Sequence, residues 1–278
     1  MNRRVMLPCG ETVPALGQGT WFLGDDPARK DEEIAALRHG IERGLNLIDT
    51  AEMYGSGRAE RLVGEAIADC RDDVFLVSKV LPNNAGERAA VAACEASLER
   101  LGTDRLDLYL LHWQGSVAFE DTIAAFERLQ AEGKIRHFGV SNLDLEAMRA
   151  FHGAPGGAAV QTNQLLYNLA QRGIEWDLLP WQRERDIPTM AYSPFDHGAL
   201  LQNKKLTAFA AERDITAAQA ALAWLLDRDD VIPIPNTASA DRAAENVGAL
   251  DIVFDADDRA ELDRLFAPPA GPRALQIY

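Results

Sequence analysis

The sequence contains little cysteine and no long apolar run. Its three cysteines, Cys9, Cys70 and Cys94, are scattered over 278 residues and form no CxxC pair. An odd and dispersed set argues against a disulfide framework and fits a reducing cytoplasm. No apolar stretch approaches the roughly 20 residues that a membrane helix needs. The apolar start is interrupted by Pro8 and Gly10, so a signal peptide is not expected.

Positive charge is also scarce. The chain has 28 Lys and Arg against 43 Asp and Glu, and its net charge at pH 7 is -15. Such a surface repels phosphate backbones and anionic lipids, so neither nucleic acid nor a membrane surface is an expected partner. The remaining composition, 47% hydrophobic and 26% charged, is typical of a globular protein.

Several catalytic motifs are missing. The sequence has no HExxH, and its five histidines are dispersed, so no metal site is expected. It has no GxSxG, which disfavours a nucleophile elbow, and no GxxxxGK[ST] phosphate loop. No tyrosine is followed four residues later by lysine, which disfavours the YxxxK class of reductases.

Short β-type runs alternate with helical patterns along the whole chain. Eight such runs occur, at residues 15–20, 45–50, 74–80, 106–113, 135–142, 158–164, 187–193 and 231–237. Between them apolar residues recur at helix spacing, as in segments 31–44, 87–102, 119–134 and 216–227. This alternation predicts parallel βα units closed into a (β/α)8 TIM barrel, one α/β domain over residues 1–278.

The segment before the first run predicts an additional element. The strand-like stretches "RVMLP" and "ETVPAL" flank Cys9 and Gly10 and predict a β-hairpin that caps the barrel floor. A doubly wound sheet is the alternative fold. Its GxGxxG fingerprint would need a third glycine where Phe22 follows Gly17 and Gly19.

Polar residues stand where the predicted strands end, which is where barrel enzymes carry their chemistry. Asp49, Lys79 and His112 end three successive strands, and Tyr54 follows in the loop "LIDTAEMYGSG". A buried Lys79 ammonium needs a partner, and Asp49 is the obvious one. A tyrosine hydroxyl near that cation would have a lowered pKa and could act as a general acid. His112 could orient a substrate oxygen.

Each of these residues also has an ordinary structural interpretation. Asp49 could cap a turn, and Tyr54 could be a half-buried packing residue. Lys79 could extend to solvent, and His112 could be a structural histidine. Their joint placement on adjacent strand ends favours one catalytic set over four separate structural roles.

The ordered segments "GQGTW", "LIDTAEMYGSG", "VSKV", "LDLYLLHW", "GKIRHFGVSN", "TNQLLYN", "AYSP" and "PIPNTASADRAAEN" make a specific combination. With them the chain resembles the aldo-keto reductases over essentially its whole length, and most closely the small bacterial members that reduce methylglyoxal and related aldehydes. The resemblance implies a tetrad of Asp49, Tyr54, Lys79 and His112. Tyr54 would donate a proton to a carbonyl oxygen while a nicotinamide delivers hydride, and Lys79 with Asp49 would lower the Tyr54 pKa.

The same resemblance implies a cofactor site. Ser141, Asn142 and Gln164 would hold the nicotinamide carboxamide, and Tyr192 would stack on its ring. The full expected set is Gly19, Thr20, Trp21, Asp49, Ser141, Asn142, Gln164, Tyr192, Ser193, Phe195, Asn236, Thr237, Arg242 and Asn246.

Thr237, Arg242 and Asn246 would bind the adenosine 2′-phosphate, although a helix cap and a solvated face would also explain them. Asn236 stands where many relatives carry lysine, which removes a charge-assisted contact worth about 1.5–3 kcal/mol. NADPH is therefore the expected cofactor, and NADH is the alternative.

The substrate pocket is expected to be lined by Trp21, Met53 and Trp113, each of which could equally be a packing residue. The tail after Phe266, "APPAGPRALQIY", is short, whereas a longer tail in relatives helps to wall the pocket. An open pocket with broad specificity is therefore expected. The predicted activity is NADPH-dependent reduction of small aldehydes and ketones to alcohols by a monomer.

Two other functions stay open. Some relatives are regulatory subunits that hold cofactor with little turnover, so a redox-sensing binding protein is one alternative. The intact tetrad argues against it. Without the resemblance, a barrel hydrolase with paired carboxylates such as Asp49 and Glu52 is the other, and it would need no nucleotide.

Overall fold

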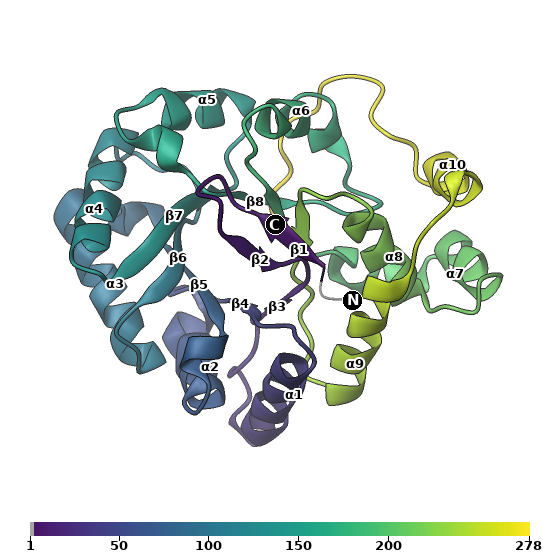
Figure 1. Ribbon diagram of the computed structural model, residues 1–278, viewed down its shortest axis with the longest axis horizontal. Helices are drawn as coiled ribbons and strands as arrows, with labels where there is room; N and C mark the ends of the chain where they lie inside the picture. The colour runs from purple at the N-terminus through teal and green to yellow at the C-terminus, as the bar shows by residue number, and fades with distance from the viewer. Residues whose placement is uncertain (1–2) are drawn as a thin grey trace.

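The computed structural model describes residues 3–278, and its strands form a central barrel with helices around it (Figure 1). Neighbouring strands pair in parallel and in chain order. They are β3 (Gly17–Gly19), β4 (Leu47–Asp49), β5 (Phe75–Val80), β6 (Leu106–Leu111), β7 (Ile135–Ser141), β8 (Asn163–Leu166), β9 (Thr189–Tyr192) and β10 (Val231–Pro233). The predicted (β/α)8 barrel is confirmed.

The helices form the outer layer, and α1 packs against α9 to complete the ring (Figure 1). They are α1 (Lys30–Glu42), α2 (Arg58–Ile67), α3 (Glu87–Leu101), α4 (Phe119–Ala131), α5 (Leu145–Gly153), α6 (Leu178–Arg183), α7 (Lys204–Ala211), α8 (Ala217–Leu226), α9 (Ala240–Gly248) and α10 (Ala256–Leu265). Thr216 and Gln219 form a capping box at the start of α8. Within residues 3–278, no helix combines the length and the apolar character needed to cross a membrane.

One strand is displaced from its predicted position. The sixth barrel strand was expected at 158–164, but β8 covers Asn163–Leu166 and a 3-10 turn occupies Gly157–Ala159. Gly156 precedes that turn with a left-handed φ of 77°, a backbone conformation that glycine adopts without steric cost. The small apolar residues of this stretch therefore belong to a turn rather than to the strand.

Alternation along the strands separates two apolar layers. In β5, Phe75 and Val77 join the cluster inside the barrel, whereas Leu76 and Val80 pack outward against the helices. Because successive strand side chains point to opposite faces, Lys79 has the inward parity of Val77. The strand thus delivers its only cation to the interior, at the carboxyl end of the barrel.

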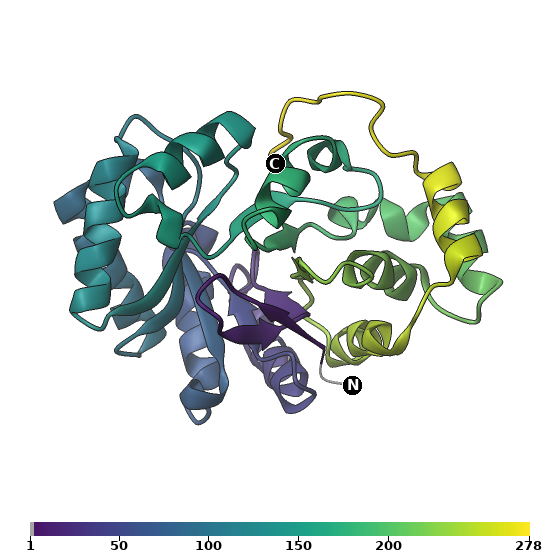
Figure 2. The same cartoon turned by 45° about the horizontal axis from the view of Figure 1, so that its top comes forward.

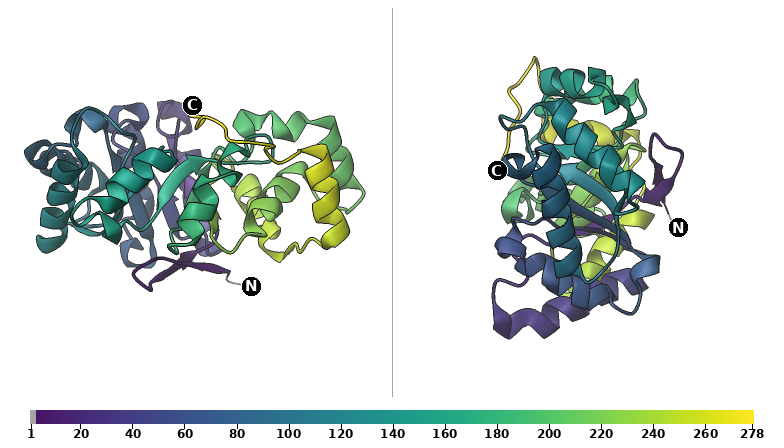
Figure 3. Two further views of the ribbon diagram at one scale, coloured as in Figure 1. Left: turned by 90° about the horizontal axis from the view of Figure 1, so that it is seen from above. Right: turned by 90° about the vertical axis from the view of Figure 1, so that its left-hand side faces the viewer.

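The amino end of the barrel is closed by the predicted hairpin. Strands β1 (Arg4–Met6) and β2 (Thr12–Pro14) pair antiparallel, and Val5 and Val13 join the interior apolar cluster. The chain after α10 runs back over the molecule (Figure 2). It ends on the side opposite the hairpin (Figure 3), so the carboxyl end of the barrel carries both the strand ends and the C-terminus.

The ladder between the last and first strands is short. Gly19 forms an isolated bridge with Asn236, and its N–H donates to the Pro235 carbonyl at 3.0 Å. A Cβ on Gly19 would lie 2.8 Å from the Ile234 carbonyl oxygen, so only glycine permits this approach. We call this junction of β3 and β10 the seam.

Candidate active site

The loop after β4 returns a tyrosine over the barrel mouth. Gly55, Ser56 and Gly57 have φ values of 55°, 53° and 85°, a left-handed run that two glycines make accessible. The chain reverses there and enters α2, and the Tyr54 ring remains only 9% exposed beside the end of β4. The glycines therefore allow a loop residue to lie over strand-end residues.

Lys79 is fully buried and uses its ammonium for three hydrogen bonds. It donates to Asp49 Oδ2 at 2.7 Å, to the Thr50 carbonyl at 2.9 Å and to the Tyr54 hydroxyl at 3.0 Å. Asp49 is 2% exposed and Lys79 0%. Three donors meet three acceptors, so the buried ion pair leaves no ammonium proton unpaired.

The surroundings set the protonation of this pair. Burial alone would lower the pKa of Lys79, but Asp49 and Tyr54 together raise it above its ordinary value. Burial raises the pKa of Tyr54, and the Lys79 ammonium opposes that rise only in part. The predicted lowering of the Tyr54 pKa therefore does not describe this structure, because desolvation outweighs the cation. Tyr54 remains protonated at neutral pH.

His112 lies beside the tyrosine at the end of β6. Its ring centroid is 5.9 Å from that of Tyr54, in an edge-on arrangement. Burial, reinforced by the Lys79 cation, lowers the pKa of His112 to about 2, so the imidazole is neutral at physiological pH. Its Nδ1 is buried without a hydrogen-bond partner in the described part of the chain. Nε2 is therefore the ring nitrogen that can form a hydrogen bond with a ligand in the cavity.

A chain of hydrogen bonds connects this group to the next strands. Gln164 Nε2 donates to Asp49 Oδ1 at 2.7 Å, and Ser141 Oγ donates to the Gln164 carbonyl at 2.9 Å. Asn142, with a left-handed φ of 56°, accepts from the Tyr192 hydroxyl at 2.9 Å. These hydrogen bonds therefore fix the orientation of the side chains that are expected to hold the nicotinamide.

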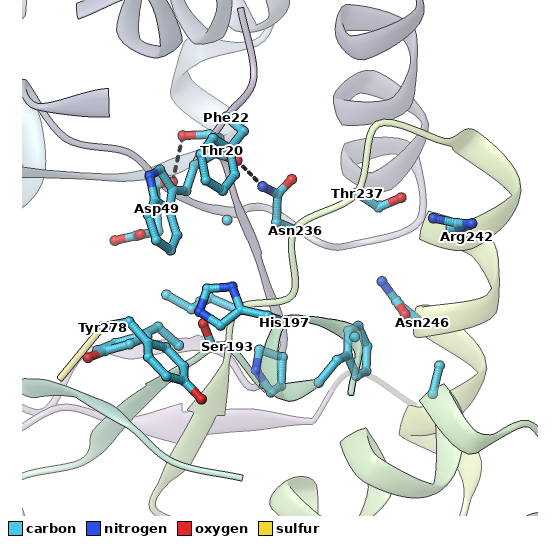
Figure 4. Close-up of a pocket in the computed structure, with 18 of the residues that line it drawn as sticks. Thr20, Phe22, Asp49, Ser193, His197, Asn236, Thr237, Arg242, Asn246 and Tyr278 are labelled. Carbon is cyan, nitrogen blue, oxygen red and sulfur yellow. Dashed lines mark hydrogen bonds between the residues drawn. The ribbon is translucent and has the colours of Figure 1, made fainter. Parts of the chain in front are cut away.

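These groups border one cavity of about 630 Å³ (Figure 4). Every residue expected at the cofactor lines it: Gly19, Thr20, Trp21, Asp49, Ser141, Asn142, Gln164, Tyr192, Ser193, Phe195, Asn236, Thr237, Arg242 and Asn246. Tyr54, His112 and Met53 line it too. Lys79 lies behind Tyr54 and Asp49. Trp113 is not among the lining residues, and its ring packs 4.8 Å from that of His112.

The outer end of the cavity carries three further polar residues. Thr237, Arg242 and Asn246 lie together on the β10–α9 segment, across the cavity from Asp49 (Figure 4). Arg242 is exposed, and no ion pair involves it within residues 3–278. The Asn236 side chain donates to the Trp21 carbonyl, so it connects the two segments at the seam.

Phe22, His197 and Tyr278 are among the lining residues that the sequence analysis missed. The Tyr278 hydroxyl donates to Asp196, its ring lies 4.2 Å from that of His197, and His197 lies 5.6 Å from Trp21. The short tail therefore reaches back and lines the cavity with Tyr278, a contact that its length alone did not predict. No periodicity or motif marks a single terminal tyrosine.

The hydrolase alternative does not fit this geometry. Glu52 Oε1 accepts from the Leu81 N–H at 2.7 Å and from Asn84 at 3.1 Å, and Glu52 is not a lining residue. Asp49 is held by Lys79 and Gln164. Neither carboxylate is free to act as one of a facing pair.

Residues 15–267 match the family model of the aldo/keto reductase family. The chain is 50% identical to Methylglyoxal reductase YeaE of Escherichia coli (strain K12), covering 96% of this chain and 95% of that protein. It is 32% identical to the glyoxal reductase of Bacillus subtilis (strain 168), covering 94% and 92%. An aldo/keto reductase of Klebsiella pneumoniae, solved in complex with NADP and acetate, is 47% identical over all of both chains with a TM-score of 0.97. The chain therefore belongs to the aldo/keto reductase family.

Proposed function

We propose that this protein is an NADPH-dependent reductase of small aldehydes and ketones, with methylglyoxal-like oxoaldehydes as its substrate class. The observation that carries the proposal is the Lys79 ammonium, bonded to both Asp49 and Tyr54 at the inner end of a cavity. The names of the relatives support the substrate class, since two of them reduce methylglyoxal or glyoxal.

The cavity suits a dinucleotide in size and in donor set. Its volume of about 630 Å³ lies within the roughly 300–1,000 Å³ usual for ligand sites. At its outer end Arg242 offers an uncommitted guanidinium, and Thr237 and Asn246 add polar groups for a 2′-phosphate. The NADP-bound relative from Klebsiella pneumoniae supports NADPH, and Asn236 in place of a lysine leaves NADH as a second cofactor.

Tyr54, Lys79 and His112 each have a separate role in the proposed reduction. Bound NADPH supplies the hydride. The Tyr54 hydroxyl, kept protonated by burial, donates its proton to the carbonyl oxygen. The Lys79 ammonium, 3.0 Å from that hydroxyl, stabilises the phenolate that remains. Neutral His112 donates a hydrogen bond that orients the carbonyl.

We further propose that the reductase acts as a monomer in the cytoplasm and takes no nucleic acid as partner. All residues of the proposed mechanism come from one chain. The three cysteines are unpaired, as in a reducing compartment. The net charge of -15 disfavours nucleic acid.

The test is Tyr54→Phe, with Tyr109→Phe as the matched control. Tyr109 is also a buried tyrosine, and its hydroxyl has no partner in the described chain. With methylglyoxal and NADPH, Tyr54→Phe should lose about 10²–10⁴-fold in kcat. The Kd for NADPH should stay within about twofold of that of the parent. Turnover retained in Tyr54→Phe contradicts the mechanism.

A substrate panel separates the reductase from the redox-sensing alternative. Initial rates are measured with NADPH and with NADH on methylglyoxal, a nitrobenzaldehyde and a sugar aldehyde. A reductase oxidises the cofactor with at least one of them. Tight NADPH binding without oxidation by any aldehyde would instead favour the redox-sensing protein.

A further inference from the structure

Three side chains with metal-binding atoms converge at the amino end of the barrel. Cys9 and Glu11 flank Gly10 in the hairpin turn, and His137 lies on β7. Cys9 Sγ is 3.8 Å from His137 Nε2, which is 2.7 Å from Glu11 Oε2. The three ligand atoms all lie within 4.8 Å of one another. The hairpin is at the end of the molecule opposite the C-terminus (Figure 3), so the proposed reductase chemistry does not use this cluster.

The geometry of the cluster differs from that of a nucleophilic triad. A triad needs one imidazole nitrogen on the thiol and the other on the carboxylate. Here the same atom, Nε2 of His137, faces both Cys9 and Glu11. One nitrogen cannot relay a proton between two partners in this way. A sulfur, a nitrogen and an oxygen within 4.8 Å of one another are close enough to reach one ion.

We propose that Cys9, Glu11 and His137 bind one Zn²⁺ ion. Thiolate, imidazole and carboxylate are its preferred ligands, with metal–ligand bonds of about 2.0–2.3 Å. In a tetrahedron those bonds put neighbouring ligand atoms roughly 3.4–3.6 Å apart. The Cys9–His137 separation of 3.8 Å is close to that range, and the His137–Glu11 separation of 2.7 Å is a direct hydrogen bond. Zn²⁺ binding therefore requires the Glu11 carboxylate to rotate away from His137 and to give up one of its two contacts to Arg136. Cys9 is exposed, which leaves the fourth position to water.

The protein orients this cluster without an ion. The Cys9 N–H donates to Gln161 Oε1 at 2.9 Å, which fixes the hairpin turn against the barrel. Arg136 donates to both Glu11 oxygens at 2.9 Å and to Asp107 at 3.0 Å. Asp107 also accepts from Arg71 at 2.8 Å, so it offsets only part of the Arg136 charge next to the site. Bound Zn²⁺ would therefore join the hairpin to β7 with little rearrangement of the backbone.

The test uses the reduced full-length chain, treated with EDTA and desalted. Titration calorimetry with ZnCl₂ should give one ion per chain. Co²⁺ used as a probe should give a sulfur-to-metal charge-transfer band. Cys9→Ser should weaken Zn²⁺ binding at least tenfold and remove the band, and His137→Gln should weaken binding to a similar extent. Cys70→Ser, the control for a half-buried thiol elsewhere, should match the parent in both measurements.

Two results would overturn the site. One is Zn²⁺ binding no tighter in the parent than in Cys9→Ser. The other is a Co²⁺ band that survives in Cys9→Ser and disappears in Cys70→Ser. The reductase rate with methylglyoxal should be the same in the parent and Cys9→Ser without metal, so failure of this site and failure of the proposed activity are seen separately.

Discussion

The inner and outer ends of the cavity differ in how their charged side chains are held. At the inner end Lys79 and Asp49 are buried and paired with each other, and Gln164 completes the carboxylate. At the outer end Arg242 is exposed and has no ion-pair partner within the described residues. The inner groups lie on strand ends and are held by one another before any ligand arrives, whereas the Arg242 guanidinium lies exposed on α9 without an ion-pair partner in the described residues.

This difference separates chemistry from selection. Preorganised charges stabilise a developing charge without reorientation at the moment of reaction. Uncommitted donors gain most when a charged ligand reaches them, since they break no existing ion pair. We therefore expect changes at the inner end to affect turnover and stability. Changes at the outer end should affect the choice of cofactor.

Lys79→Met should have the largest effect. It leaves the Asp49 carboxylate buried without its cation, which costs about 3–5 kcal/mol of unfolding free energy, and it removes the group that stabilises the Tyr54 phenolate. Urea unfolding and steady-state kinetics measure the two effects. Adding Asp49→Asn to Lys79→Met should restore much of the stability and none of the turnover. If the double variant recovered turnover as well as stability, the inner end would not be the part of the cavity that determines turnover.

Arg242→Ala should weaken NADPH binding by about 1.5–3 kcal/mol, or roughly 10–150-fold, because it deletes a charge-assisted contact to phosphate. NADH binding and kcat should change little. Fluorescence titration with each cofactor makes the measurement. Arg264→Ala, an exposed arginine on α10 outside the cavity, is the matched control. An equal loss for both cofactors would mean that Arg242 does not contact the 2′-phosphate.

His112 should make stability depend on acid pH. Its pKa in the folded state is about 2, against about 6.5 when unfolded. Below pH 6.5 the unfolded chain therefore binds a proton that the folded chain does not. This contribution to stability is complete above pH 6.5 and falls by about 1.4 kcal/mol per pH unit on acidification. His112→Asn should lose that part of the slope in urea unfolding from pH 7 to 4. An unchanged slope would show that His112 is not desolvated.

Tyr278→Ala should have the smallest effect. An exposed aromatic contact of this kind contributes about 0.5–1.5 kcal/mol, so KM for methylglyoxal or Kd for NADPH should rise roughly 2–12-fold. Tyr278→Phe keeps the ring and removes the hydroxyl that donates to Asp196, so it separates stacking from hydrogen bonding. No change in either variant would mean that the tail is a passive cover.

The strand-end residues could be predicted because they depend on local pattern. Apolar runs end at Asp49, Lys79 and His112, and a parallel barrel brings such ends together. The sign of the Tyr54 pKa shift could not be predicted in this way. It depends on how much burial outweighs one cation, and burial is a property of the assembled fold.

Contacts between distant segments were the hardest to predict. The tail has no periodicity that would place Tyr278 beside His197. His137 follows Cys9 by 128 residues, so no spacing rule joins them. Asn236 was recognised as a departure from the family, but its hydrogen bond to the Trp21 carbonyl depends on how β3 meets β10. In each case the contact joins residues that are far apart in the sequence and meet only in the folded barrel.

The seam gives the proposed cofactor a mechanical role. Gly19 and Thr20 lie on one side of this short ladder, and Asn236 and Thr237 lie on the other. A dinucleotide bound along both sides would contact the first and the last strand at once. It would hold them together at the junction where the strands share only an isolated backbone bridge. Cofactor binding would then stabilise the closed seam by the free energy of its contacts to both strands. Amide hydrogen exchange should therefore slow more at the seam than elsewhere in the barrel when the cofactor binds.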